Sequence, residues 1–323
     1  MEFWDLTLLA KPLWIWIVFF AVVLTLLLLD LGILHRKDKE ISASQSLKLS
    51  GFYVTMGLLF GVFVWVWLGP QAGKEYLTGF VIEKSLSLDN IFVISLVFSY
   101  FAIPRANQYR VLFWGIIGVI VLRGLLIGIG AELVHRFDWV LNVFAAFLLF
   151  TGIKMLFSSD KETDISKNPA IRFFKKYMRY TDELHGNKFF IRKVDLNTNK
   201  RALFATPLFL ALVTVEFVDV IFAVDSVPAI FAITTDEYIV YTSNIFAILG
   251  LRALYFALAA MLHRFQYLNY SLAAVLIFIG GKVFVTDLMG WNKFPADISL
   301  LVTVGILASG VIYSLYKTRQ DVK

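Results

Sequence analysis

Acidic side chains interrupt two segments that are otherwise apolar enough to lie in a membrane. The ionisable residues of these segments, which cover residues 81–93 and 215–232, are Glu83, Lys84, Asp89, Glu216, Asp219 and Asp225. A charged side chain at the centre of a bilayer costs about 2.5–3.5 kcal/mol on insertion scales. A chain that keeps five carboxylates at such positions is expected to use them, and binding of a cation or a proton is the chemistry they suit.

The oxygen ligands offered by these segments favour a hard divalent cation. Carboxylates, the Asn90 amide and a main-chain carbonyl suit Mg²⁺, Ca²⁺ or Mn²⁺. Pro228 could supply a helix break and leave the Val224 carbonyl without its N–H partner. The chain has no cysteine, and its four histidines fall at span ends or in loops, so Zn²⁺ and Cu⁺ are poor candidates. The candidate metal ligands are Glu83, Asp89, Asn90, Glu216, Asp219, Val224 and Asp225.

Three basic residues accompany the acids, and two interpretations of them stay open. Lys84, Arg123 and Arg252 are the candidate counter-ions or structural partners. Five deep acids against three deep bases leave two negative charges, which matches one divalent cation. Alternatively, the acids only pair with the bases to hold helices together. No permanent cofactor is expected.

Composition sets the frame in which these residues lie. The chain of 323 residues is 59% hydrophobic and only 17% charged, whereas soluble domains are about 25% charged. Its apolar blocks are long enough to cross a bilayer as helices. We therefore predict an all-α membrane protein with about nine transmembrane helices, at residues 13–34, 50–68, 77–101, 110–133, 137–157, 203–232, 239–262, 266–288 and 296–316.

The distribution of Lys and Arg predicts the orientation. Residues 158–202 contain eleven Lys and Arg, and the other basic loops fall on the same side of the nine-span layout. The positive-inside rule then places the N-terminus outside and the C-terminus in the cytoplasm of a plasma (bacterial inner) membrane. Loop 158–202 is expected to contain a basic amphipathic stretch at residues 171–180 and a hairpin around Asn197. Topology also explains the net charge of +6, so nucleic acid is not an expected partner.

An internal repeat is visible in the order of four landmarks. Residues 83–89 correspond to 219–225, Arg123 to Arg252, and the His-Arg-Phe run at 135–137 to that at 263–265. Lys154 and Lys282 each follow seventeen residues after the phenylalanine. Each unit holds three spans, so the second copy must be inverted, as in many secondary transporters. The chain is thus predicted to be one domain, 1–323, with repeat 1 at 77–157, a cytoplasmic loop at 158–202 and repeat 2 at 203–288.

The motifs resemble those of the TerC family over nearly the whole chain. The resemblance is carried by residues 83–90, 216–232 and 242–252, and is strongest to the Alx branch of that family through the nine-span layout and the run at 189–192. It implies an inner-membrane exporter of Mn²⁺ whose intramembrane acids carry the metal. Those acids map onto Glu83, Asp89, Glu216, Asp219 and Asp225. Older descriptions of the family speak of tellurium resistance and redox modulation.

Two other classes of function compete with export. The first is a non-transporting membrane partner in a metal-stress, tellurium-resistance or envelope complex, with loop 158–202 as its docking surface. The second is an intramembrane aspartyl protease, but Asp89 follows Leu-Ser-Leu and Asp225 follows Phe-Ala-Val instead of Gly-x-Gly. We therefore expect no enzyme activity. The expected partners are membrane lipid and Mn²⁺, with Ca²⁺ or H⁺ as further candidates for transport.

Overall fold

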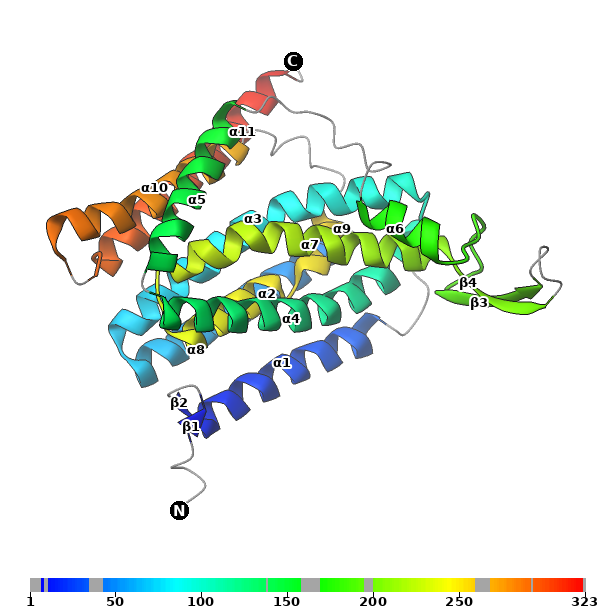
Figure 1. Ribbon diagram of the computed structural model, residues 1–323, viewed down its shortest axis with the longest axis horizontal. Helices are drawn as coiled ribbons and strands as arrows, with labels where there is room; N and C mark the ends of the chain where they lie inside the picture. The colour runs from blue at the N-terminus through cyan, green and yellow to red at the C-terminus, as the bar shows by residue number, and fades with distance from the viewer. Residues whose placement is uncertain are drawn as a thin grey trace.

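The computed structural model describes the chain over residues 7–8, 11–34, 43–137, 139–157, 169–194, 200–258, 268–291 and 293–321. Within these ranges the protein is almost entirely helical, which confirms the predicted all-α multi-pass class (Figure 1). The helices are α1 (Leu13–Leu34), α2 (Ala43–Leu68), α3 (Pro70–Tyr100), α4 (Arg105–Arg136), α5 (Trp139–Phe157), α6 (Pro169–Tyr177), α7 (Pro207–Phe231), α8 (Glu237–Ile248), α9 (Leu251–Leu258), α10 (Leu268–Met289) and α11 (Ala296–Asp321).

Eight described segments are long and apolar enough to cross a membrane, and α8 and α9 together form one of them. Helix α3 is not among the eight because its 31 residues include the charged residues of the predicted site, Glu83, Lys84 and Asp89. At 1.5 Å per residue it is nevertheless about 46 Å long. The expected ninth crossing therefore depends on α3, and the number and orientation of the crossings stay predictions.

Helices α3 and α7 pack against each other and are covered by the helices around them. Helix α4 packs on α7, α8 packs on α3, and α5 packs along α10. Helix α2 lies against α3 and α9, and α11 lies against α10 and α3. In Figure 1, α5, α10 and α11 gather at one end of the molecule. The landmark at residues 263–265 lies outside the described residues.

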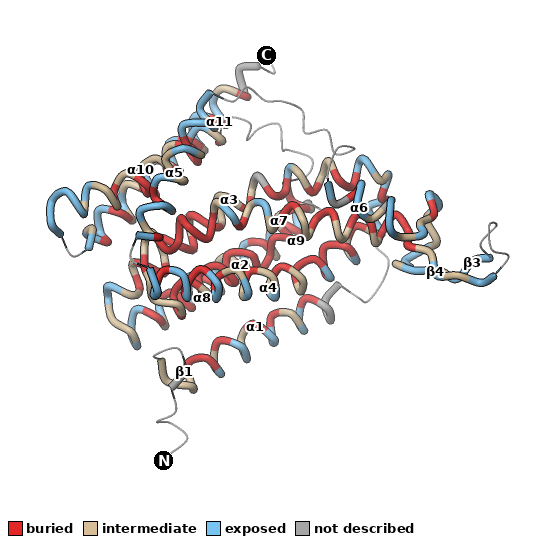
Figure 2. The backbone as a smooth tube through the Cα atoms, in the orientation of Figure 1, coloured by how far each residue is buried: buried red, intermediate tan, exposed pale blue. Residues whose placement is uncertain are grey.

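Buried residues are concentrated in the central helices, whereas the outer helices and ends carry more exposed residues (Figure 2). An aromatic core joins α1, α2, α3 and α8. In it the rings of Phe60 and Phe246 stack with centroids 4.4 Å apart. The Tyr238 hydroxyl donates to the carbonyl of Ile15 at 3.2 Å, which ties α8 to the start of α1.

The break in the helices lies elsewhere than the sequence suggested. Helix α7 is continuous from Pro207 to Phe231, with Pro228 inside its last turn. Pro228 has no N–H, so the carbonyl of Val224 lacks its usual helical partner, yet the helix continues to Phe231. Instead, the seventh predicted span is interrupted between α8 and α9. Gly250, with φ +81°, occupies the interruption, a left-handed conformation that glycine adopts without steric cost.

The polar segment before α7 forms small elements at one end of the bundle. The predicted hairpin is confirmed as β3 (Phe190–Val194) paired with β4 (Arg201–Ala205), although its turn around Asn197 lies outside the described residues. The amphipathic stretch is confirmed as α6, with Ile171 buried and Phe173 and Tyr177 exposed. A two-residue pair, β1 (Thr7–Leu8) with β2 (Lys11–Pro12), precedes α1.

Candidate functional site

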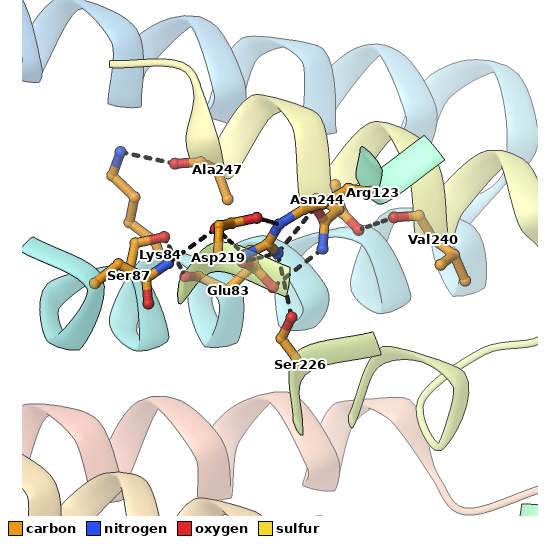
Figure 3. A network of polar contacts seen from close by, with 11 residues as sticks. Glu83, Lys84, Ser87, Arg123, Asp219, Ser226, Val240, Asn244 and Ala247 are labelled. Carbon is orange, nitrogen blue, oxygen red and sulfur yellow. Dashed lines mark hydrogen bonds and ion pairs between the residues drawn. The ribbon is translucent and has the colours of Figure 1, made fainter. Parts of the chain in front are cut away.

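Arg123 lies at the centre of a buried polar cluster (Figure 3). Its Nε and Nη2 donate to the two carboxylate oxygens of Asp219 at 3.0 and 2.9 Å. Its Nη1 forms a short ion pair with Glu83 and donates to Ser226 Oγ and Asn244 Oδ1, both at 3.2 Å. Asn244 in turn donates to the second Glu83 oxygen at 3.0 Å. One guanidinium thus holds two carboxylates and two neutral polar groups.

Four helices supply these side chains. Glu83 comes from α3, Arg123 from α4, Asp219 and Ser226 from α7, and Asn244 from α8. Asp219 and Ser226 are seven residues apart, about two helical turns, so they lie on one face of α7. Because α3 and α4 belong to the first predicted repeat and α7 and α8 to the second, the cluster joins the two predicted repeats.

Burial makes the charges of this cluster interdependent. Glu83, Arg123 and Asp219 are 0%, 1% and 5% exposed. A buried charge is tolerated when it is paired and hydrogen-bonded, and removal of one partner leaves the other uncompensated. Two carboxylates against one guanidinium leave a net negative charge of one when all three groups are ionised. The cluster therefore attracts a further cation or proton.

Lys84 does not join the carboxylates, although it follows Glu83 directly. Its Nζ donates to the carbonyl of Ala247 at 2.9 Å (Figure 3). It also donates to the carbonyl of Leu249 at 3.4 Å. These carbonyls are at the C-terminal end of α8, where a helix has unpaired acceptors and partial negative charge. Lys84 thus stabilises the interruption between α8 and α9.

Arg252 has a partner that the sequence analysis missed. It pairs with Asp30 of α1, and its guanidinium carbon lies 4.2 Å from the centre of the Tyr109 ring. Arg252 and Asp30 are 2% and 5% exposed. A lone aspartate inside a 22-residue apolar helix was the signal available. The predicted count of deep charges left Asp30 out and also omitted Lys282, which is buried and donates to Ser299 at 2.9 Å.

Two cavities adjoin the cluster from opposite directions along α7. One, of ≈ 60 Å³, is lined by Glu83, Asn90, Asp225 and Ser226 among others. Since a water molecule needs roughly 10–15 Å³ on this measure, this cavity has room for several waters or an ion. The other, of ≈ 20 Å³, is lined on its polar side by Asn90, Asp219 and Arg252.

Asn90 is the polar residue that both cavities share. Its Nδ2 donates to Asp219 Oδ1 at 3.3 Å, while its Oδ1 is buried with no hydrogen-bond partner. An unpartnered buried acceptor is costly and is usually satisfied by water or a ligand. Asn90 therefore separates the two cavities and has an oxygen available for a cation.

The predicted ligands do not all meet. Asp225 lies near Thr151 and Lys154 of α5 and lines the larger cavity together with Glu83. Val224, whose main-chain carbonyl was the predicted ligand, is 52% exposed and does not line either cavity. The side chain of Asp89 lies outside the described residues. Among the side chains that are described, no three of the His, Asp and Glu type come close enough together to hold a metal ion.

Glu216 lies apart from this cluster, against α4. Both of its carboxyl oxygens are buried without a hydrogen-bond partner. A Cβ added to Gly118 would overlap this carboxyl group, and one added to Gly115 would lie 3.6 Å from its Oε1. The two glycines thus provide the space that the Glu216 side chain occupies between α4 and α7.

Comparison with known proteins relates the chain to one family of membrane proteins. Residues 68–322 match the family described as "Integral membrane protein TerC family". A membrane protein of Rickettsia bellii is 47% identical over 302 residues, which are 94% of this chain and 97% of the relative. No solved structure matches the chain.

Two further relatives have a more specific name. Proteins of Salmonella typhi and Escherichia coli, each named "Putative membrane-bound redox modulator Alx", are 44% and 45% identical to this chain over 315 and 307 residues. The alignments cover 95% and 92% of this chain and 95% and 93% of the two relatives. The similarity thus extends over nearly the full length of both partners.

Proposed function

The chain belongs to the TerC family of integral membrane proteins, and on that premise we propose that it exports Mn²⁺ across the bacterial inner membrane. The observation that carries the proposal is the larger cavity beside the buried cluster. Glu83 and Asp225 line it from α3 and α7, so two carboxylates that are 142 positions apart in the sequence (225 − 83) line one cavity.

The atoms around this cavity suit a hard divalent cation. Carboxylate oxygens, the unpartnered Asn90 Oδ1 and the Ser226 hydroxyl are the ligand types that Mn²⁺, Mg²⁺ and Ca²⁺ prefer. Two carboxylates and one amide oxygen leave coordination positions for water. Mn²⁺ is chosen among these cations through the family resemblance of the motifs and not through the ligands alone.

Arg123 offsets part of the negative charge of the site when no metal is bound. It already pairs with Glu83 and Asp219, so the empty cluster does not present bare carboxylates to an apolar interior. A cation entering between Glu83 and Asp225 would compete with Arg123 for Glu83. Such competition is suited to a transported ion, which must bind and then leave.

The name of the Alx relatives suggests redox modulation, and this chain limits how that could occur. It contains no cysteine, so the chain itself has no thiol to oxidise or reduce. The sites described above are built from carboxylates, amides and guanidinium groups, which do not exchange electrons under ordinary conditions. Metal export would change cellular redox state indirectly, through the manganese supply of other proteins.

Manganese flux into or out of proteoliposomes tests the proposal directly. Wild type, Asp225→Asn and Glu83→Gln are compared, with Mg²⁺, Ca²⁺ and Zn²⁺ as competitors. We expect wild-type flux that competing Mg²⁺ inhibits weakly and that both substitutions abolish. The matched control is Glu132→Gln, which removes an exposed ion pair with Arg136 on α4 and should leave flux unchanged.

Absence of flux in folded, inserted wild-type protein would overturn the proposal. Undiminished flux in Asp225→Asn would instead show that the cavity is not the cation site. In the first case the chain would be better explained as a non-transporting partner, and the carboxylates as groups that pair helices. Gel filtration in detergent and thermal unfolding identify variants that fail to fold.

A further inference from the structure

Arg123 and Arg252 occupy corresponding positions in the two predicted repeats. Leu122-Arg123-Gly124 corresponds to Leu251-Arg252-Ala253, and Glu83 corresponds to Asp219. The helix packing follows the same correspondence. Helix α4 of the first repeat packs on α7 of the second, and α8 of the second repeat packs on α3 of the first. The corresponding helices α5 and α10 pack along each other. If the repeats exchange roles, the pairing of Arg123 with Asp219 and Glu83 becomes a pairing of Arg252 with the same two carboxylates.

The second arginine is already next to one of those carboxylates. Arg252, Asp219 and Asn90 line the same small cavity, and all three are buried. In the present state the Arg252 guanidinium is retained by Asp30 and stacks over the Tyr109 ring. Asp30 is on α1, outside both repeats. The two arginines therefore have different partners, although they occupy corresponding positions in the two repeats.

The main chain next to Arg252 also differs from that next to Arg123. Helix α4 is continuous through Arg123, whereas the helix of Arg252 begins one residue after Gly250, whose φ is +81°. Interrupted helices near the midplane are typical of the moving parts of transporters. A small rotation at the interruption would move Arg252 relative to α8.

We propose that Arg252 replaces Arg123 at Asp219 in the alternate state of the transporter, so that the two arginines serve in turn as its built-in counter-ion. The inference rests on the proposed cation transport. Its physical basis is that buried carboxylates need a positive partner in every state. Whenever the cation has left, one of the two arginines supplies that charge, and the return of the empty carrier becomes possible.

The absence of native cysteine allows a direct test with single introduced thiols. Met155 lines the larger cavity, so Met155→Cys reports whether that cavity is open to a small membrane-impermeant thiol reagent. Its labelling rate is measured in proteoliposomes without added divalent cation, in four backgrounds: unchanged, Asp30→Asn, Arg252→Lys and Glu132→Gln. Lysine is chosen because it keeps the charge but loses the planar fork that binds a carboxylate through two hydrogen bonds.

The exchange predicts opposite effects for the two variants of the Arg252 pair. Asp30→Asn releases Arg252 toward Asp219 and should slow labelling of Met155→Cys by on the order of threefold or more, because populations shift away from the present state. Arg252→Lys keeps a charge for the contact with Asp30 but loses the planar fork that would bind Asp219 through two hydrogen bonds. It therefore weakens the alternate state more than the present one and should speed labelling. Glu132→Gln should have no effect.

A shift in the same direction for both variants, or no shift beyond that of the Glu132→Gln control, would overturn the exchange. If Asp30→Asn does not fold, faster labelling in Arg252→Lys is still required, and its absence is sufficient to reject the proposal. The labelling needs no Mn²⁺. If the predicted labelling shifts were seen without manganese flux, the exchange of arginines would be supported and Mn²⁺ would be rejected as the transported ion. The failure of one proposal is therefore distinguishable from the failure of the other.

Discussion

Arg123 binds Asp219 through both of its carboxylate oxygens, with Nε at 3.0 Å and Nη2 at 2.9 Å. This two-bond geometry is the strongest that an arginine and a carboxylate form. Because the remaining Nη1 reaches Glu83, Ser226 and Asn244, the guanidinium fixes α3, α4, α7 and α8 relative to one another. The residues of the candidate site therefore also hold the central helices together.

The first prediction concerns the stability that this pair provides. Asp219→Asn should lower the free energy of unfolding by about 1.5–3 kcal/mol, the usual contribution of a hydrogen bond to a charged group, because Glu83 still compensates the charge of Arg123. Arg123→Lys should cost less, because it keeps the charge but loses the two-bond geometry. Thermal unfolding in detergent measures both. A change no larger than that of Glu132→Gln, an exposed pair, would contradict the cluster as described.

The second prediction concerns the space that Gly118 leaves for Glu216. Gly118→Ala should destabilise the protein, because the new methyl group would overlap the Glu216 carboxyl. Gly128→Ala is the matched control on the same helix, since a Cβ there meets nothing within 4 Å; it should be neutral or slightly stabilising.

A double-mutant cycle then assigns the effect of Gly118 to Glu216. Combining Gly118→Ala with Glu216→Ala should cost less than the sum of the two single changes, because the overlap exists only when both side chains are present. Thermal unfolding of the four proteins of the cycle gives the interaction. Additive effects would mean that the methyl group collides with something other than Glu216.

The third prediction concerns the interruption between α8 and α9. Gly250→Ala should lower the stability by about 1–2 kcal/mol from the left-handed backbone alone. It should lower it further because the added Cβ would lie 2.5 Å from the Cβ of Tyr53. Gly281→Ala on α10, where a Cβ meets nothing within 4 Å, is the control. Equal unfolding temperatures for the two variants would show that the interruption is not formed as described.

Much of the fold was predictable because apolar composition and helical length leave few alternatives in a membrane. The same reasoning singles out Glu83, Arg123 and Asp219 from the sequence alone, since charges inside apolar segments are rare enough to be conspicuous. Even the hairpin β3–β4 in the polar segment was predictable from its alternating residues.

Which side chain each charged residue pairs with was not predictable to the same degree. Glu83 and Lys84 are adjacent, so they point about 100° apart on α3, and nothing in the sequence says that the first faces α4 and the second the end of α8. Similarly, Pro228 is a stronger sequence signal for a break than Gly250, because glycine is common in membrane helices. Helix α7 nevertheless continues through Pro228 to Phe231, and the interruption lies at Gly250.

The fourth prediction separates transport from stability at Asn90. Asn90→Leu removes the donor to Asp219 and the unpartnered Oδ1 that both cavities share. Asp219 Oδ1 still accepts from Arg123 at 2.9 Å, so the loss of stability should be about 1 kcal/mol, the usual contribution of one hydrogen bond. Manganese flux should nevertheless fall at least about tenfold, since leucine offers no oxygen ligand to the cation.

The matched variant is Asn90→Asp, which keeps an oxygen ligand in the same place but sets a second negative charge against Asp219. It should reduce stability more than Asn90→Leu, because like charges in a buried site repel, while metal binding at the cavity is retained. Flux in proteoliposomes and unfolding temperature in detergent are measured on the same preparations. If Asn90→Leu transports Mn²⁺ like the wild type, the residue between the two cavities is a packing residue and the route of the ion lies elsewhere.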